Sequence, residues 1–529
     1  MTGTYGGLAI SGFIVFIVLF VVFAILGFAG RYFRKGDETQ LNEWALAGRK
    51  LGVVLTWFLI GADLYTAYTF IAIPSALYAN GGIYFFAVPY VALTFAVAMM
   101  TMPKLWVISK KKGYITAADF VADTFSSKTL GLLIALTGIV SELPYVGLQL
   151  VGMKAVLTMM FPATTGNIGL IVDFALIISV IILIAFTFMS GLRGVTLTAL
   201  FKDVIIFTSV IVVIIAVPLA YGGFQHAFSV AAAQKTLYST LSLKSYAVGY
   251  PTLWVGSALA LYLYPHAVNG SLSSKNSQNL RMSTALLPIY GIGLALLALF
   301  GVLIFAVPQA LNYVQNVGDS GVYIVPALIL YTMPSWFSGF AFLGIFIGGL
   351  VPAAIMSMAS ANLFIRNVFK PYIRKNLDPK VETLYAKITT IIFIFIAVLF
   401  TLVVNDTYAI QLQLLAGGLI LETLPALFLG LYWPKLNKHS MIVGWAVGMF
   451  LDVYLELSAN ITLANSKHSS FSFATSFFNF GALNGTEILI FVGLFSVMVN
   501  VIISVIGTYV TRAMGIRNSK EEAPAKAEA

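Results

Sequence analysis

The sequence predicts an all-α polytopic membrane protein with about thirteen transmembrane helices. Of its 529 residues, 60% are apolar and only 9% are charged, whereas soluble domains are about 45–50% apolar and about 25% charged. The mean hydropathy is +0.94. Apolar stretches of about 18 or more residues, enough to cross a bilayer as a helix, recur along the whole chain. These stretches lack the residue-by-residue alternation of an outer-membrane barrel.

The predicted spans follow one another with short connections, so no soluble domain is expected. The first span has no small-residue cleavage site after a short apolar core, and we therefore expect a helix and not a signal peptide. The thirteen spans are 8–30, 51–79, 82–102, 129–160, 169–189, 195–221, 246–268, 284–308, 337–365, 386–404, 409–432, 441–458 and 485–511.

The basic residues decide the expected orientation. With the N-terminus outside, 25 of the 30 Lys and Arg residues fall in inner loops or the C-terminal tail and three in outer loops, while Lys154 and Lys202 lie inside spans. This asymmetry is the positive-inside pattern. It predicts a multi-pass plasma-membrane protein with its N-terminus outside and its C-terminus in the cytoplasm. The net charge of +10 is then a topology signal.

Several classes of function are excluded by what the sequence lacks. The short loops hold no basic patch with aromatic residues, so no nucleic-acid partner is expected. The absence of Cys rules out thiolate metal sites and a Cys nucleophile. No nucleophile–base arrangement or phosphate-binding Gly loop is visible, which argues against an enzyme and against an ATP-driven pump. We expect no organic cofactor, membrane lipid and a small-molecule solute as partners, and a monomer or homo-oligomer.

Two spans carry interruptions at corresponding places. The second contains Gly61-Ala62-Asp63 and then Pro74, and the seventh contains Pro251 and then Pro265-His266. Five spans separate their starting points, and a repeat with an odd number of spans must be inverted relative to its copy. Interrupted spans in two halves point to a transporter's midplane binding site. The alternative is that Pro and Gly are simply common in membrane helices.

Asp63 and Lys202 are the charged residues of most interest inside the spans. A carboxylate at the depth of Asp63 is costly and usually faces a cavity or a partner; the alternative is a carboxylate satisfied by neighbouring helices. Lys202 lies about two turns into the sixth span. Its neighbour Asp203 should not face it, because adjacent helix positions point in different directions. The Lys202 ammonium could also simply extend to the cytoplasmic surface.

The other polar residues inside the spans have less certain roles. Glu142 and Lys154 are separated by about 18 Å of helix, too far to pair. Gln149 could present a donor to a cavity together with Tyr145, one turn away. A capping or inter-helix hydrogen bond is the commoner explanation for His266, although His can also carry protons. Glu422 is expected only to make an unassigned polar contact.

Three motifs, taken in order, resemble the sodium:solute symporter family. Gly61-Ala62-Asp63 continuing to Pro74 is similar to its first core helix, residues 190–195 to its glycine-rich basic motif, and residues 353–357 to its eighth core helix. Within the family, the monocarboxylate permease branch is the most similar, on residues 57–59, 63–72, 113–121, 136–140 and 148–152.

The resemblance implies a five-plus-five inverted-repeat (leucine-transporter-like) core with one extra N-terminal helix and two C-terminal helices. The implied units are an extra helix and inner loop at 1–50, a first repeat at 51–221, a second, inverted repeat at 246–432, two peripheral helices at 441–511, and a disordered cytoplasmic tail at 512–529. It also implies a symporter that imports lactate, pyruvate or short-chain acids by alternating access, driven by a proton or sodium gradient.

The family's sodium site carries over onto five positions. The resemblance places two backbone carbonyls at Ala62 and Tyr65 and three further ligands at Ala354, Ser357 and Met358, with Asp63 nearby. Two departures stand out: Met358 offers no hydroxyl, and Ala199 stands where the family often has Asp. Lys202 lies one turn beyond Ala199, so its amine could stand where Na⁺ would and couple transport to protons, because burial disfavours a charged amine. Sodium remains the alternative coupling ion.

The substrate site is harder to predict. No Arg lies in mid-membrane to bind a carboxylate in two-pronged fashion, so a half-helix N-terminus would have to attract the anion. The expected additional contacts, which suit a two- to four-carbon acid, are Thr66, Tyr68, Gln149, Tyr250 and Trp254. A symporter for another solute, such as an amino acid like proline, a sugar or a vitamin, remains an alternative, as does a membrane channel or sensor.

Overall fold

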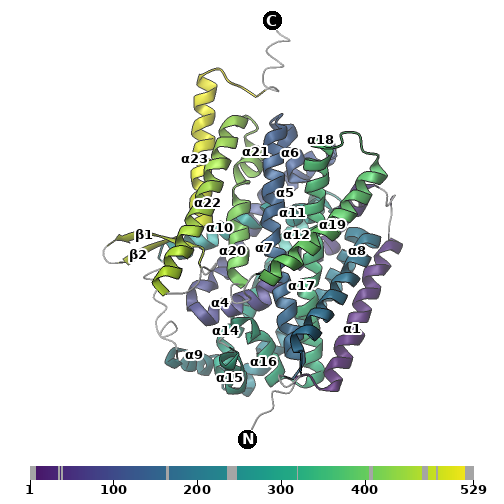
Figure 1. Cartoon of the computed structure of the whole chain (residues 1–529), viewed down its shortest axis with the longest axis vertical. Helices are drawn as coiled ribbons and strands as arrows, with labels where there is room; N and C mark the ends of the chain where they lie inside the picture. Colours follow the sequence, from purple (N-terminus) through teal and green to yellow (C-terminus); the bar gives the residue numbers. More distant parts are fainter. Residues whose placement is uncertain are drawn as a thin grey trace.

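The computed structural model describes residues 7–33, 36, 40–162, 166–234, 247–317, 320–403, 409–467, 475–483 and 486–518. These parts of the chain are mainly helical, with one two-stranded sheet at the side of the molecule (Figure 1). Helices α1 and α8 lie together on one side, and α22 and α23 lie together on the opposite side (Figure 1).

The N-terminal helix α1 (Ile10–Ala29) is apolar on all faces and leaves large side chains such as Ile10 and Ile25 exposed. An apolar outer surface of this kind suits contact with lipid. The helix packs against α8 and α17. Three short elements follow it, namely η1 (Gly30–Phe33), α2 (Leu41–Leu46) and η2 (Ala47–Arg49).

The second predicted span is a broken helix, as the sequence indicates. Helix α3 (Val53–Ala62) ends at Ala62, the chain leaves the helical path, and it re-enters through the π-helix η3 (Tyr68–Ala72) and α4 (Ile73–Asn80). The next elements are η4 (Gly81–Phe86), α5 (Ala87–Lys112), α6 (Ala117–Thr124) and α7 (Lys128–Met160).

Helix α8 (Ile168–Ala220) contains two predicted spans, 169–189 and 195–221, with no loop between them. They meet at a kink at Gly191, whose φ of 57° and ψ of −151° lie in a region open to glycine. A side chain there would also press on the backbone of Trp44. Helix α9 (Gly223–Gln234) follows.

The seventh predicted span is the second broken helix. Helix α10 (Gly249–Ala260) passes into the 3₁₀ turn η7 (Leu261–Leu263), Tyr264 takes a non-helical ψ of 138°, and α11 (Pro265–Leu272) begins with a proline. Proline suits the first helical position because its missing N–H would have no helical partner there. The predicted span 284–308 covers parts of α12 (Ser277–Leu286), α13 (Pro288–Ala298), α14 (Phe300–Leu303) and η8 (Ile304–Ala306).

The remaining core centres on α17 (Ser335–Leu363), which packs against α1, α7, α8 and α19. Its most apolar 18-residue stretch is 94% buried, so α17 is the innermost of the long helices in the described chain. The other elements of this region are α15 (Pro308–Asn316), η9 (Gly321–Tyr323), α16 (Ile324–Thr332), η10 (Phe364–Phe369), α18 (Lys370–Tyr372), α19 (Pro379–Val403), α20 (Ala409–Leu421), η12 (Pro425–Leu429) and α21 (Gly430–Tyr432).

The C-terminal region differs from the prediction at one point. After α22 (Lys438–Lys467), an antiparallel hairpin is formed by β1 (Phe477–Leu483) and β2 (Thr486–Phe491), and α23 (Val492–Ala513) follows. The span predicted at 485–511 is therefore wrong at residues 486–491, which form β2. The run Ile-Leu-Ile-Phe is apolar enough for either structure, and pairing with β1 decides it.

Nine helices of the described chain are long and apolar enough to cross a membrane, or ten if the pair joined at a 45° bend between α20 and η12 is one span. The two broken spans consist of shorter pieces, and α8 holds two predicted spans. Thirteen crossings therefore stay a prediction, as does the division into repeats. Residues 519–529 of the predicted tail lie outside the described residues, while Asn518 Nδ2 donates to Leu436 O at 2.7 Å.

Candidate functional site

The break after α3 exposes backbone carbonyl oxygens in the middle of the protein. The Asp63 and Leu64 N–H groups donate to Ile60 O and Gly61 O, a tighter pattern than that of an α-helix. The Gln149 side-chain oxygen accepts a hydrogen bond from the Ala67 N–H at 3.0 Å and so holds the unwound segment against α7. The carbonyls within this turn can therefore point away from the helix axis.

Lys202 reaches these carbonyls from α8. Its Nζ donates to Ala62 O at 2.8 Å and to Tyr65 O at 2.7 Å, and the residue has no exposed surface. The family resemblance assigns these same two backbone oxygens as sodium ligands. The side chain does not extend to the cytoplasmic surface, so that alternative is wrong for this structure.

Asp203 pairs with its neighbour Lys202, contrary to the prediction. Its Oδ1 lies 3.1 Å from Lys202 Nζ, and its Oδ2 accepts a hydrogen bond from the Tyr290 hydroxyl at 2.6 Å. Successive helix positions do point apart, but the four-carbon lysine stem is long enough to bend back toward the carboxylate. The ion pair also supplies the counter-charge that a fully buried ammonium needs.

The three predicted ligand positions on α17, namely Ala354, Ser357 and Met358, are buried. The Ser357 hydroxyl donates to Ala353 O of its own helix at 2.7 Å. Ala354 and Met358 offer no side-chain oxygen. Because Lys202 already uses two carbonyls and Met358 lacks a hydroxyl, the residues present do not fit a sodium ion at this place. A hard cation would need several free oxygen ligands there.

Asp63 lies at the end of α3 in a dense set of buried charges. Its carboxylate interacts electrostatically with His266 and Lys202, and also with Glu142 and Asp203. Both its oxygens are buried without a hydrogen-bond partner among the described residues. The sequence argument identified Asp63 but could not show which of these groups surround it.

His266 and Glu142 form a pair at the second break. His266 Nδ1 lies 2.8 Å from Glu142 Oε1, and the His266 backbone N–H donates to the same oxygen at 3.3 Å. Neither residue has exposed surface. The inter-helix hydrogen bond expected of His266 is therefore present, but its partner was missed, since 124 residues separate the two. A Glu inside a span was the signal that could have found it.

The five predicted substrate residues do not all lie together. Thr66, Tyr68 and Gln149 surround the first break: the Thr66 hydroxyl accepts a hydrogen bond from the Tyr68 N–H at 3.1 Å, and Gln149 binds the Ala67 N–H. Tyr250 and Trp254 lie on α10 before the second break and are half-buried. Their roles in substrate binding stay predictions.

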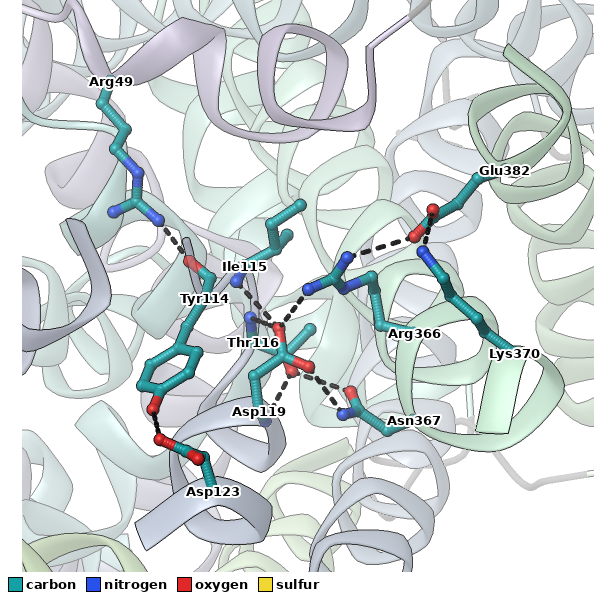
Figure 2. A network of polar contacts seen from close by, with 10 residues as sticks. All are labelled: Arg49, Tyr114, Ile115, Thr116, Asp119, Asp123, Arg366, Asn367, Lys370 and Glu382. Carbon is teal, nitrogen blue, oxygen red and sulfur yellow. Dashed lines mark hydrogen bonds and ion pairs between the residues drawn. The ribbon is translucent and has the colours of Figure 1, made fainter. Parts of the chain in front are cut away.

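A second polar network is formed around Arg366 and Asn367 of η10, and Figure 2 shows its side chains. Asp119 of α6 is at its centre and accepts hydrogen bonds from the Ile115 and Thr116 N–H groups at 2.9 and 3.2 Å. Thr116 in turn caps α6, which completes a capping box. The Asn367 side chain donates to Asp119 Oδ1 at 2.9 Å. This network therefore joins the start of α6 to η10, which continues α17.

The same network extends to α19 and to the region before α3. Arg366 lies between two carboxylates, 3.4 Å from Asp119 and 3.3 Å from Glu382, as Figure 2 shows. Arg49 donates to the backbone oxygens of Tyr114 and Leu272. Burial lowers the pKa of Arg49 to about 10, which still leaves the guanidinium charged near neutral pH. In the sequence alone, these basic residues indicate only the topology.

Glu422 has a defined partner at the bend between α20 and η12. Asn500 of α23 donates to Glu422 Oε2 at 2.8 Å and to Glu422 O at 3.0 Å. Asp452 of α22 lies close to this pair and accepts a hydrogen bond from Ser496 at 3.2 Å. The polar contact expected for Glu422 thus ties the bent helix to the peripheral pair.

With this geometry established, comparisons place the chain in a class of secondary transporters. The sodium:solute symporter family matches residues 44–448. A "Monocarboxylate transport permease protein" of Rhizobium johnstonii is 39% identical over 452 residues, which are 85% of this chain and 88% of the relative. An uncharacterized symporter of Bacillus subtilis, YodF, is 32% identical over 472 residues, 87% of this chain and 90% of that protein.

A solved structure supports the same fold. It is described as the substrate-bound outward-open state of a Na⁺-coupled sialic acid symporter, has a TM-score of 0.69 and 16% sequence identity, and covers 95% of this chain and 98% of that chain. The chain belongs to the sodium:solute symporter family and has its leucine-transporter-like helical fold. Its similarity to the monocarboxylate permease of Rhizobium johnstonii agrees with the motifs that resemble the monocarboxylate branch.

Proposed function

We propose that this protein is a proton-coupled symporter that imports small monocarboxylates across the plasma membrane by alternating access. The observation that carries the proposal is the position of Lys202 Nζ, 2.8 and 2.7 Å from the Ala62 and Tyr65 carbonyl oxygens. The substrate class is supported by the name of the Rhizobium johnstonii relative. The orientation, with the N-terminus outside, is supported by the distribution of basic residues.

Charge repulsion favours a proton over sodium as the coupling ion. A Na⁺ about 4 Å from the Lys202 ammonium would be repelled by about 4 kcal/mol at an effective dielectric constant of about 20. Met358 provides no oxygen to offset this cost. The ammonium itself satisfies the carbonyls and is neutralised by Asp203 at 3.1 Å. One side chain thus supplies the charge that a bound metal ion would otherwise bring.

Protonation of Lys202 would change the contact between α8 and the broken helix. The charged amine makes charge-assisted hydrogen bonds to both carbonyls and an ion pair with Asp203, and these are stronger than bonds from a neutral amine. Release of the proton needs an acceptor, which water supplies when it reaches the site. Release of the proton would weaken the hydrogen bonds that hold the break after α3 against α8. The protonated and deprotonated proteins would then favour different conformations, as a transport cycle requires.

The decisive experiment uses the purified wild-type chain in proteoliposomes. Counterflow with a panel of labelled monocarboxylates defines the substrate, with proline and a sugar as competitors. Uptake is then driven by a pH gradient alone or a sodium gradient alone. We expect concentrative uptake of a two- to four-carbon acid with the pH gradient in sodium-free buffer. Uptake that needs sodium and ignores pH would refute the proton coupling.

A further inference from the structure

Beyond the coupling cation, the second break holds an unused hydrogen-bonding group. We propose that His266, oriented by Glu142, is the residue that binds the carboxylate of the substrate, and that it takes up a proton when it does so. This inference rests on the proposed monocarboxylate transport, but it concerns a different residue from Lys202 and a different step, namely substrate binding.

The geometry fixes the direction of the imidazole ring. Glu142 Oε1 lies 2.8 Å from His266 Nδ1, so this carboxylate accepts a hydrogen bond from the Nδ1–H. The ring of Tyr264 stacks on the imidazole with centroids 5.3 Å apart, and Tyr145 meets it edge-on at 5.7 Å. With Nδ1 bonded to Glu142, Nε2 is the ring nitrogen left available to a ligand.

His266 Nε2 is buried and has no hydrogen-bond partner among the described residues. The same is true of Glu142 Oε2, of both Asp63 oxygens and of the Tyr262 hydroxyl, all close to the two helix breaks. Buried polar groups are nearly always paired, and each unpaired one costs about 1–3 kcal/mol. A group of them between two broken helices therefore marks a place for a polar ligand.

The rest of this region offers no other cationic anchor for a carboxylate. The sequence predicts that the N-terminus of a half-helix attracts the anion, but at the start of α11 the His266 N–H already donates to Glu142 at 3.3 Å. Among the described residues, the other basic group that interacts with Asp63 is Lys202, which is already bonded to two carbonyls and to Asp203. His266 is thus the remaining group able to carry a positive charge.

A proton must accompany the anion. Neutral His266 would present a lone pair at Nε2 to the incoming carboxylate, whereas the protonated ring presents an N–H donor and a positive charge. The titratable groups around His266 are Glu142 and Tyr145 from α7, Asp63 from the end of α3, and Tyr264 beside it; α17 has no titratable side chain. Two neighbouring carboxylates would repel a substrate anion that entered without a proton.

The test measures the half-saturating substrate concentration in counterflow as a function of pH, with no gradient of protons or sodium. For the wild type it should rise as pH rises, since the protonated ring becomes scarcer. His266→Gln keeps a donor but cannot be protonated, and should weaken binding by about 10- to 100-fold at acidic pH and remove the pH dependence. His439→Gln, an exposed histidine on α22, is the matched control and should behave as the wild type.

Glu142→Gln tests the positioning role separately. The amide can still accept from Nδ1–H but no longer stabilises the charged ring, so the pH dependence should move toward lower pH without being lost. If His266→Gln fails to fold, the wild type and Glu142→Gln still provide a test. A half-saturating substrate concentration that does not depend on pH in either protein would overturn the inference.

Unchanged affinity and pH dependence in a folded His266→Gln protein would overturn this inference alone. Absence of monocarboxylate counterflow in the wild type would overturn the proposed function as well. If the wild type shows monocarboxylate counterflow but sodium drives its uptake, the role of Lys202 is overturned. The role of His266 is then still supported, provided that the half-saturating concentration depends on pH as expected.

Discussion

Replacing Lys202 with Met removes the amine while keeping a long, flexible apolar side chain. The substitution leaves Ala62 O and Tyr65 O, now bonded at 2.8 and 2.7 Å, without their donor. A buried acceptor left unpaired costs about 1–3 kcal/mol. The two together therefore cost about 2–6 kcal/mol in the closed state, in which α8 packs against the break as the structure shows. Asp203 retains the Tyr290 hydroxyl but loses its counter-charge.

This cost translates into a measurable defect in transport. Each 1.4 kcal/mol is a factor of ten in an equilibrium, so the closed state should be depopulated by about 30-fold or more. In proteoliposomes with an inward proton gradient and no sodium, concentrative uptake should fall to the level measured without a gradient.

Lys154→Met is the matched control, because Lys154 lies within α7 and is half-buried yet plays no part in the proposed coupling. It should transport as the wild type does. Full pH-driven accumulation by Lys202→Met, at wild-type expression, would refute the reasoning that the amine couples transport to protons.

Three further substitutions test other parts of the structure. Lys202→Ala combined with Met358→Ser frees two carbonyls and adds a hydroxyl, so sodium should stimulate its uptake; indifference to sodium would contradict our assignment of this place as a cation position. Arg366→Ala removes one cationic partner from Asp119, which keeps its amide donors, and from Glu382, which keeps Lys370. It should lower stability by about 1–3 kcal/mol, read as an earlier thermal unfolding in detergent; unchanged unfolding would show that the network is dispensable. Gly61→Ala places a methyl group against the ring of Tyr290, and overpacking of this kind costs about 1–3 kcal/mol; wild-type thermal stability would argue against the tight packing described.

The fold class and the first helix break were accessible from the sequence because both depend on local signals. Long apolar stretches identify membrane helices by composition alone. The break at Gly61–Asp63 is marked by small and charged residues where a continuous helix would have apolar ones. Lys202 could be connected to Ala62 and Tyr65 only through the family resemblance, because spans far apart in the chain supply the amine and the carbonyls.

The contacts that could not be predicted depend on three-dimensional packing. The Glu142–His266 pair joins residues from α7 and α11, and neither local sequence indicates which residue is the partner. The Lys202–Asp203 pair was wrongly excluded, because a rule for helix faces takes no account of a side chain long enough to bend. The strand at 486–491 forms only because β1 is available to pair with it, whereas its apolar composition suits a helix equally well.

The amine of Lys202 is attached to the chain by covalent bonds, and this gives the cation position an occupant that cannot be diluted. A free ion leaves its site when the surrounding solution is depleted of it, and a carrier that depends on such an ion then stops. An attached ammonium does not depend on the ion concentration in the solution; only its protonation responds to the surroundings. Under the proposed function, a cell would take up organic acids through this protein without spending any of its sodium gradient, at whatever salinity it lives.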